Sequence, residues 1–170
     1  MPLTYPVEVA DIAIMLALMA ARNVEYSLSV VQSGKWPTVG WAPFGFCGPQ
    51  LGPGPVAGKT FTVGFLGFGR ISQATLHRLV PFGVTHAIYT DSGRGGRSSA
   101  DDEVLRQKYA GFGRLEEVRR VTLDELAQNS DLVILLAPGK HEALFSTLRA
   151  SPNKTCRRRW HPSHYQHGVP

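Results

Sequence analysis

Short apolar runs alternate with amphipathic segments along most of this sequence. Runs rich in β-branched and aromatic residues predict strands over 61–66, 84–90, 118–121 and 131–137. Helical spacing or helix-capping residues predict helices over 70–80, 100–110, 122–129 and 141–149. Such alternation is typical of an α/β fold with a parallel sheet and right-handed crossovers. The run at 131–137 is almost continuously apolar, so we expect this strand to be buried on both faces.

The first 58 residues lie outside this alternation. Residues 7–33 contain no Gly or Pro, and their apolar residues recur at roughly helical spacing, which predicts one long helix in the core or at a subunit interface. Residues 34–58 contain seven Gly and five Pro, so they cannot form regular ladders. Four aromatic residues among them indicate that this segment lies against another surface.

A glycine-rich turn joins the strand at 61–66 to the helix that follows. The turn reads Gly67-x-Gly69-x-x-Ser72, so it places backbone N–H groups and the positive end of a helix dipole at one point, which suits a pyrophosphate. Gly67 allows the tight turn and Gly69 the close approach of a phosphate. The third position is normally Gly or Ala, so we expect Ser72 to weaken the turn without excluding the motif.

An acidic residue stands where a ribose would meet this turn. Asp91 follows the strand at 84–90, about 20 residues after the glycines, which is the position of an acid that binds a ribose hydroxyl. Strand, glycine turn, helix, strand and acid follow one another in the expected order. The sequence therefore predicts a dinucleotide site at the carboxyl ends of the strands.

Charge and cysteine content do not alter the prediction of a dinucleotide site. The formal net charge is +5, but residues 151–170 carry three Arg and one Lys without an acid, so the basic character belongs to the tail. Cys47 and Cys156 have no metal-like spacing and fit a reducing compartment, so we expect no metal site. The apolar run at 12–21 is too short to span a bilayer, and no positive charge precedes it. We expect a cytoplasmic protein without a membrane contact.

Taken together, these residues resemble the NAD(P)-binding domain of the D-isomer-specific 2-hydroxyacid dehydrogenases, in particular the glyoxylate/hydroxypyruvate reductase branch. The matches run in order over residues 7–150 and include Val9 to Ala13, Ser33 to Trp36, Gly67 to Ile71, Pro81 to Val84, Ile88 to Thr90 and Leu123 to Leu126. The resemblance implies a partial Rossmann-type doubly wound domain over 1–150, with its nucleotide-binding core at 59–150, and an irregular tail at 151–170.

The resemblance also implies which residues contact the cofactor. The pyrophosphate is expected at the glycine turn, the ribose after the second strand, and the far side of the cofactor after the fourth strand. The expected cofactor-binding residues are Gly67, Phe68, Gly69, Arg70, Ile71, Thr90, Asp91, Ser92, Arg94, Ala137, Pro138 and Gly139. Asp91 repels a 2′-phosphate whereas Arg94 and Arg97 can hold one, so NAD and NADP both stay open. The branch tends to use NADPH, which we slightly favour.

The implied parent activity is NAD(P)H-dependent reduction of a small 2-oxo acid. Family members use an Arg that holds the substrate carboxylate and a His–Glu pair that handles the carbonyl proton. No residue here matches these three, and the family's first domain has no counterpart, which implies truncation at both ends. We therefore expect no catalytic residue in this chain and little or no turnover. His77, His86 and His141 are expected to pack against helices or lie at the surface.

Two alternative functions are compatible with the sequence, and the tail has its own interpretation. One alternative is a non-catalytic nucleotide-binding or dimerising fragment, since the segment at 7–58 lies at the subunit interface in the family and would allow a homodimer. The other is a basic-tailed binding module, but four positive charges are a small footprint for nucleic acid. For the tail we prefer a frameshift, because a one-base shift allows 160–168 to read as Gly-Ile-Leu-Val-Ile-Ile-Asn-Thr-Ala, which resembles the family's fifth strand.

Overall fold

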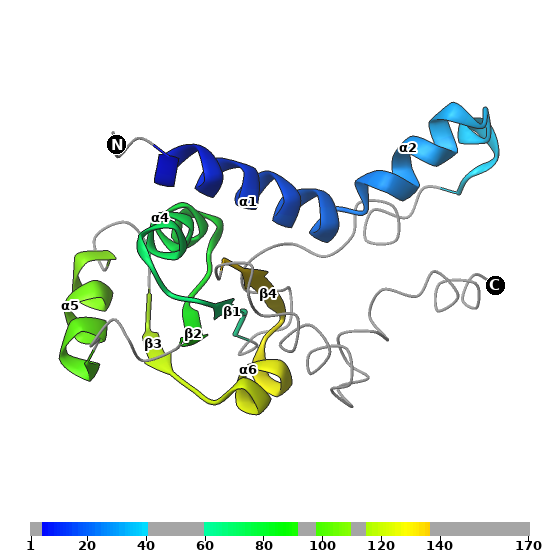
Figure 1. Cartoon of the computed structure of the whole chain (residues 1–170). Coiled ribbons are helices and arrows are strands. Elements are labelled where there is room, and N and C mark those ends of the chain that lie inside the picture. Colours follow the sequence, from blue (N-terminus) through cyan, green and yellow to red (C-terminus); the bar gives the residue numbers. More distant parts are fainter. Residues whose placement is uncertain (1–4, 41–59, 92–97, 110–114, 137–170) are drawn as a thin grey trace.

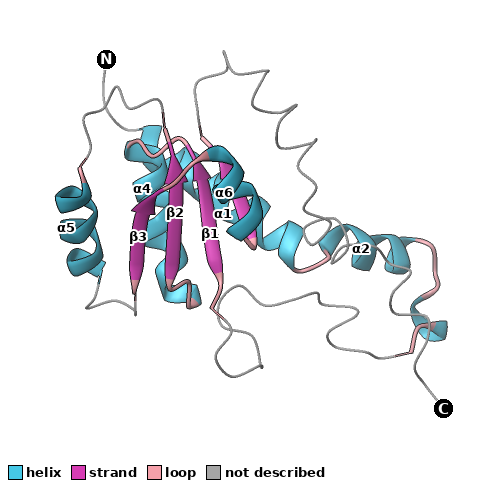
Figure 2. Cartoon of the chain, turned by 90° about the horizontal axis from the view of Figure 1, so that it is seen from below, coloured by secondary structure: helices cyan, strands magenta, loops and turns pink. Residues whose placement is uncertain are grey.

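The computed structural model describes residues 5–40, 60–91, 98–109 and 115–136 of the 170-residue chain (Figure 1). A parallel sheet lies at the centre of the described part, with helices on both of its faces (Figure 2). The expected helix over 141–149, both cysteines and the tail at 151–170 lie outside the described residues.

Four short strands form the sheet. They are β1 (Thr62–Leu66), β2 (His86–Thr90), β3 (Glu117–Arg120) and β4 (Leu132–Leu135). All neighbours pair in parallel, in the order β3-β2-β1-β4. The chain moves outward from β1 to β3 and then returns to the other side of β1, so a topological switch point lies between β1 and β4. The predicted α/β fold with a partial doubly wound sheet is confirmed.

The crossover helices begin and end close to the predicted positions. They are α4 (Arg70–Leu79), followed by a 3-10 turn η2 (Val80–Phe82), α5 (Ser99–Tyr109) and α6 (Leu123–Asn129). The hydroxyl of Thr122 accepts a hydrogen bond from the backbone N–H of Glu125 at 3.2 Å, so the predicted cap of α6 is formed.

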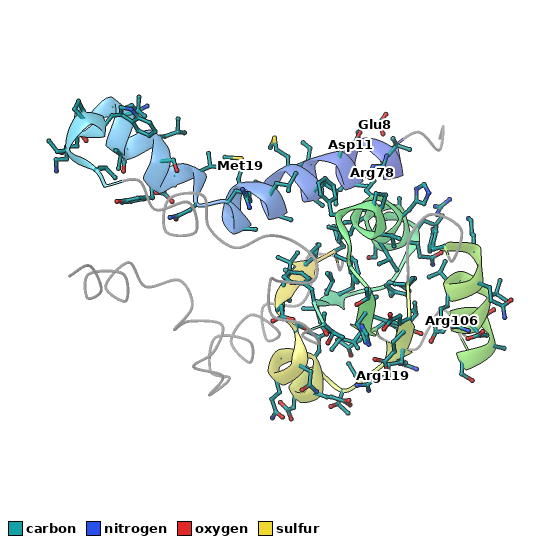
Figure 3. All side chains as sticks on the ribbon, turned by 180° about the vertical axis from the view of Figure 1, so that it is seen from behind. Glu8, Asp11, Met19, Arg78, Arg106 and Arg119 are labelled. Atoms are coloured by element: carbon teal, nitrogen blue, oxygen red, sulfur yellow. The ribbon has the colours of Figure 1, made fainter. Side chains whose placement is uncertain are left out.

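The main core lies between one face of the sheet and the helices α1 (Tyr5–Ala21), α4 and α5. Val63 and Phe65 of β1 point to this face and are fully buried with Leu76 and Leu79 of α4. Helix α1 lies along α4, and Asp11 and Arg78 form an ion pair between the two helices (Figures 1 and 3). The N-terminal helix is therefore part of the α/β unit.

The opposite face of the sheet is covered by α6, where Leu126 packs against Ile88 and Val121. The backbone of β1 approaches this helix so closely that Gly64 has no room for a side chain. A Cβ atom at Gly64 would lie 2.1 Å from Oγ of Ser130 and 3.1 Å from Cδ2 of Leu126. A glycine inside a strand thus marks a close approach between two elements.

The expectation of one helix over 7–33 is wrong in its middle. Helix α1 ends at Ala21, and α2 (Val24–Gln32) begins after Asn23, whose φ of 56° is left-handed. Asn tolerates this conformation better than most residues, so a break needs no Gly or Pro. The figures show α2 projecting away from the sheet (Figures 1 and 2). The short 3-10 turn η1 (Trp36–Thr38) follows it.

Strand β4 is less buried than its apolar sequence predicts. Ile134 is buried, whereas Leu132, Val133 and Leu135 are half-buried. The reason is its place at the edge of the sheet, since within the described residues β4 pairs with β1 alone. Over the same described ranges, no helix combines the length and the apolar character needed to cross a bilayer.

Candidate functional site

The glycine turn lies where β1 ends, beside the end of β2. Thr90 is the register partner of Leu66, and the N–H of Gly67 donates to the carbonyl of Thr90 at 2.8 Å. Gly67 has a φ of 89°, a left-handed conformation that strains residues with a Cβ atom. The structure thus brings Gly67 and the predicted ribose residues Thr90 and Asp91 to one edge of the sheet.

Ser72 closes this turn. Its side chain is buried, and its hydroxyl donates to the carbonyl of Gly67 at 2.7 Å. Both backbone polar groups of Gly67 are therefore bonded, one to Thr90 and one to Ser72. The expectation that Ser72 weakens the turn does not match this geometry, because the hydroxyl fits and bridges the turn to the helix.

Gly69 is open toward the space above the turn. It lies at the N-cap of α4 with a φ of −84°, which any residue adopts, and an added Cβ atom would meet nothing within 4 Å. Among the described residues no side chain caps the first turn of α4, so within that part of the chain Arg70 and Ile71 begin the helix without the usual acceptor for their N–H groups. A helix start of this kind suits an anion. The residues present therefore fit a pyrophosphate.

Phe68 differs from the other residues of the glycine motif because it acts through a buried side chain. Its ring is buried and stacks on the ring of Tyr89, with centroids 4.2 Å apart and an interplanar angle of 13°. Tyr89 in turn donates its hydroxyl to the buried carboxylate of Asp102 on α5. The ring of Phe68 thus anchors the turn in the core.

The carboxylate of Asp91 has a cationic partner that the sequence reasoning missed. Nη2 of Arg120, at the end of β3, lies 2.8 Å from Oδ1 of Asp91 and donates to the Asp91 carbonyl at 3.3 Å. A sequence signal existed, because Arg120 lies near the end of the strand predicted over 118–121, and parallel strands end at the same edge of a sheet.

The remaining expected site residues are Ser92, Arg94, Ala137, Pro138 and Gly139, and they lie outside the described residues. Leu136 precedes Ala137, and its N–H donates to the carbonyl of Leu66 at 3.0 Å. The chain after β4 therefore leaves the sheet next to the glycine turn.

The described histidines lie away from this edge. His77 is on α4 with its ring 5.1 Å from the ring of Tyr109. His86 begins β2, at the end of the strand opposite to Thr90, where Nε2 lies 4.0 Å from a carboxylate oxygen of Glu117. These positions fit packing or surface roles, and the lack of a catalytic role for both residues stays a prediction, while His141 lies outside the described residues. No group of three or more His, Cys, Asp or Glu within the described ranges is arranged to hold a metal ion.

Comparisons with known proteins point to one family. The family profile described as "D-isomer specific 2-hydroxyacid dehydrogenase, NAD binding domain" matches residues 14–145. The chain is 32% identical over 126 residues to the human glyoxylate reductase/hydroxypyruvate reductase, covering 74% of this chain and 31% of that protein. It is 36% identical over 131 residues to the glyoxylate reductase of Thermococcus litoralis, covering 76% of this chain and 33% of that protein.

A solved structure of D-2-hydroxyisocaproate dehydrogenase is also similar. It superposes with a TM-score of 0.57 and 25% identity, covering 81% of this chain and 33% of that one. The chain thus spans about a third of the length of the curated relatives it matches. The matched residues 14–145 include the glycine turn, Asp91 and Arg120.

Proposed function

This chain belongs to the D-isomer-specific 2-hydroxyacid dehydrogenases, and from that membership we propose that its α/β unit binds a nicotinamide dinucleotide. The pyrophosphate would lie at Gly67 to Ile71 and the adenosine ribose at Thr90 and Asp91. This proposal rests on one observation at Gly69: its backbone conformation suits any residue, and the neighbouring atoms leave room for a Cβ atom. Room for a close ligand is the remaining physical reason for glycine at that position.

The parent activity that we propose is the reduction of a small 2-oxo acid such as glyoxylate or hydroxypyruvate. When bound, a reduced nicotinamide supplies the hydride for such a reduction. The residues of this chain would orient the dinucleotide through the amides at the start of α4 and the carboxylate of Asp91. The described His–Glu pair, His86 and Glu117, lies at the opposite end of β2. We therefore propose that this chain binds the dinucleotide with little or no turnover.

Both dinucleotides remain candidates, with NADPH slightly favoured. Asp91 favours an unmodified ribose, since its carboxylate accepts hydrogen bonds from hydroxyl groups and repels a 2′-phosphate. Arg94 and Arg97, which follow in the sequence, supply positive charge for a 2′-phosphate. The cysteine content supports a cytoplasmic location as part of the same proposal.

The test compares two glycines of the chain. Gly69→Ala places a methyl group where the ligand would approach, whereas Gly40→Ala also has nothing within 4 Å of its added Cβ atom but lies far along the chain from the turn. Titration of NADH and NADPH by calorimetry should show binding to the unmodified chain and to Gly40→Ala. Binding to Gly69→Ala should be weaker by about tenfold or more, the equivalent of one lost charge-assisted hydrogen bond.

Two results would contradict the proposal. One is the absence of binding of either dinucleotide to the unmodified chain. The other is equal affinity of the Gly69→Ala and Gly40→Ala variants. Glyoxylate-dependent oxidation of NADPH, measured in the same samples, tests whether the chain also turns over.

The two N-terminal helices support a second proposed role, the formation of a homodimer through 7–58. Helix α1 has two apolar stripes. Ala10, Ile14, Ala17 and Ala21 form the buried one, and Ile12, Met15, Leu16 and Met19 form the exposed one. Leu28 and Val31 of α2 and Trp36 of η1 are exposed as well. A contiguous exposed apolar stripe is typical of a surface that another subunit covers.

A further inference from the structure

Three strand ends meet at the carboxyl edge of the sheet. The glycine turn follows β1, Asp91 follows β2, and Arg120 ends β3. Tyr89 is the register partner of Arg120, and the N–H of Val121 donates to the carbonyl of Tyr89 at 2.8 Å. The parallel register therefore places Arg120 beside Asp91, which lies two residues after Tyr89.

The guanidinium of Arg120 contacts Asp91 through one of its three nitrogens. Nη2 makes both contacts, the ion pair at 2.8 Å and the hydrogen bond to the carbonyl at 3.3 Å. Nε and Nη1 of Arg120 have no partner among the described residues. The side chain of Arg120 is 47% exposed, compared with 19% for Asp91. The cation is thus held next to the carboxylate while most of its donors remain accessible to a ligand.

The ion pair between Asp91 and Arg120 changes the charge at the predicted ribose site. An isolated Asp at the end of β2 disfavours a 2′-phosphate by repulsion. A guanidinium beside it balances that charge, and its planar set of N–H donors matches the oxygens of a phosphate. Because Arg120 lies on β3, its position is set by the sheet.

We propose that Arg120 is a specificity-determining residue of the ribose end: it balances Asp91, so that the site accepts dinucleotides with and without a 2′-phosphate. This inference rests on the proposed dinucleotide binding. Arg120 donates to Asp91 when an unmodified ribose is bound, and its accessible nitrogens donate to the phosphate when one is present.

The preceding residue provides a matched control. Arg119 has the same charge, but adjacent residues of a strand point to opposite faces. Arg119 pairs with Glu117 and with Glu125 of α6, and the hydrogen bond that it donates to the Glu125 carboxylate raises the pKa of Arg119. Figure 3 labels Arg119 beside β3 and α6. Removal of either arginine changes the net charge equally, so a difference between the two variants reports position.

The experiment measures the Kd values of NADH and NADPH by calorimetry with the full 170-residue chain. Arg120→Gln should raise the Kd of NADPH by about tenfold, or about 1.4 kcal/mol, and change that of NADH by less than about threefold. Arg120→Lys, which keeps the charge, should retain most of the NADPH affinity. Arg119→Gln should leave the ratio of the two Kd values unchanged. Asp91→Asn should act in the opposite direction, with tighter NADPH and weaker NADH binding.

The outcomes separate this inference from the proposed function. If the unmodified chain binds either dinucleotide but Arg120→Gln leaves the Kd ratio unchanged, the role of Arg120 is overturned and the binding proposal stands. An equal shift in Arg119→Gln would reduce the effect to net charge and would also overturn it. Absence of binding to the unmodified chain would overturn both. Circular dichroism of each variant checks folding, and Asp91→Asn tests the pairing if Arg120→Gln does not fold.

Discussion

Gly64 shows how a single residue sets the distance between two elements. Any Cβ atom there would overlap Oγ of Ser130, whose hydroxyl donates to the carbonyl of Leu126 at 2.6 Å. The serine is therefore held in place and cannot turn away without the loss of a buried hydrogen bond. The close contact between β1 and α6 depends on both residues.

We expect Gly64→Ala to lower the free energy of unfolding by about 1–3 kcal/mol, the usual cost of an overpacked core. Ser130→Ala removes the atom of closest approach, so the double variant should lose about 1 kcal/mol less than the sum of the two single losses. Urea unfolding of the four proteins measures this coupling. Additive losses would mean that the strand shifts away from α6 and that the clash at Ser130 is not the cause.

At the scale of elements, the order and type of strands and helices followed from the sequence, because each element has its own periodicity or capping residues. The break at Asn23 did not, since a left-handed Asn leaves no mark in the hydrophobic pattern. At the site, the glycine turn and Asp91 were predicted from their spacing. The inward ring of Phe68, the bond of Ser72 and the partner of Asp91 depend on packing and register, which one sequence does not display.

Helix α6 is short, so its N-terminal cap should contribute a large part of its stability. It has seven residues and alone covers its face of the sheet within the described part, so one capping bond is a large share of its stability. Thr122→Ala should lower the free energy of unfolding by about 1 kcal/mol. Thr122→Ser keeps the hydroxyl and should lose less than half of that in the same urea titration. Equal losses would assign the effect to the methyl group of Thr122.

At the scale of the whole molecule, the exposed stripe on α1 predicts self-association. Leu16 is 55% exposed in this stripe, and a two-fold interface would bury it twice, so Leu16→Lys should convert a dimer to a monomer. Val104 of α5 is 66% exposed and lies outside 7–58, so Val104→Lys should leave the dimer intact. Sedimentation equilibrium measures both. A monomeric unmodified chain, or a Leu16→Lys variant that stays dimeric, would contradict this interface.

The two bonds that hold Gly67 have a thermodynamic consequence. Its N–H is bonded to Thr90 and its carbonyl to Ser72, so the torsion angles of this residue are fixed when the sheet forms. The entropy lost in ordering this backbone therefore belongs to folding. A ligand that arrives there gives up its own freedom of motion without the additional penalty of arranging its receptor. The turn is, in this proposal, a preorganised binding site, whose backbone conformation is already set by folding.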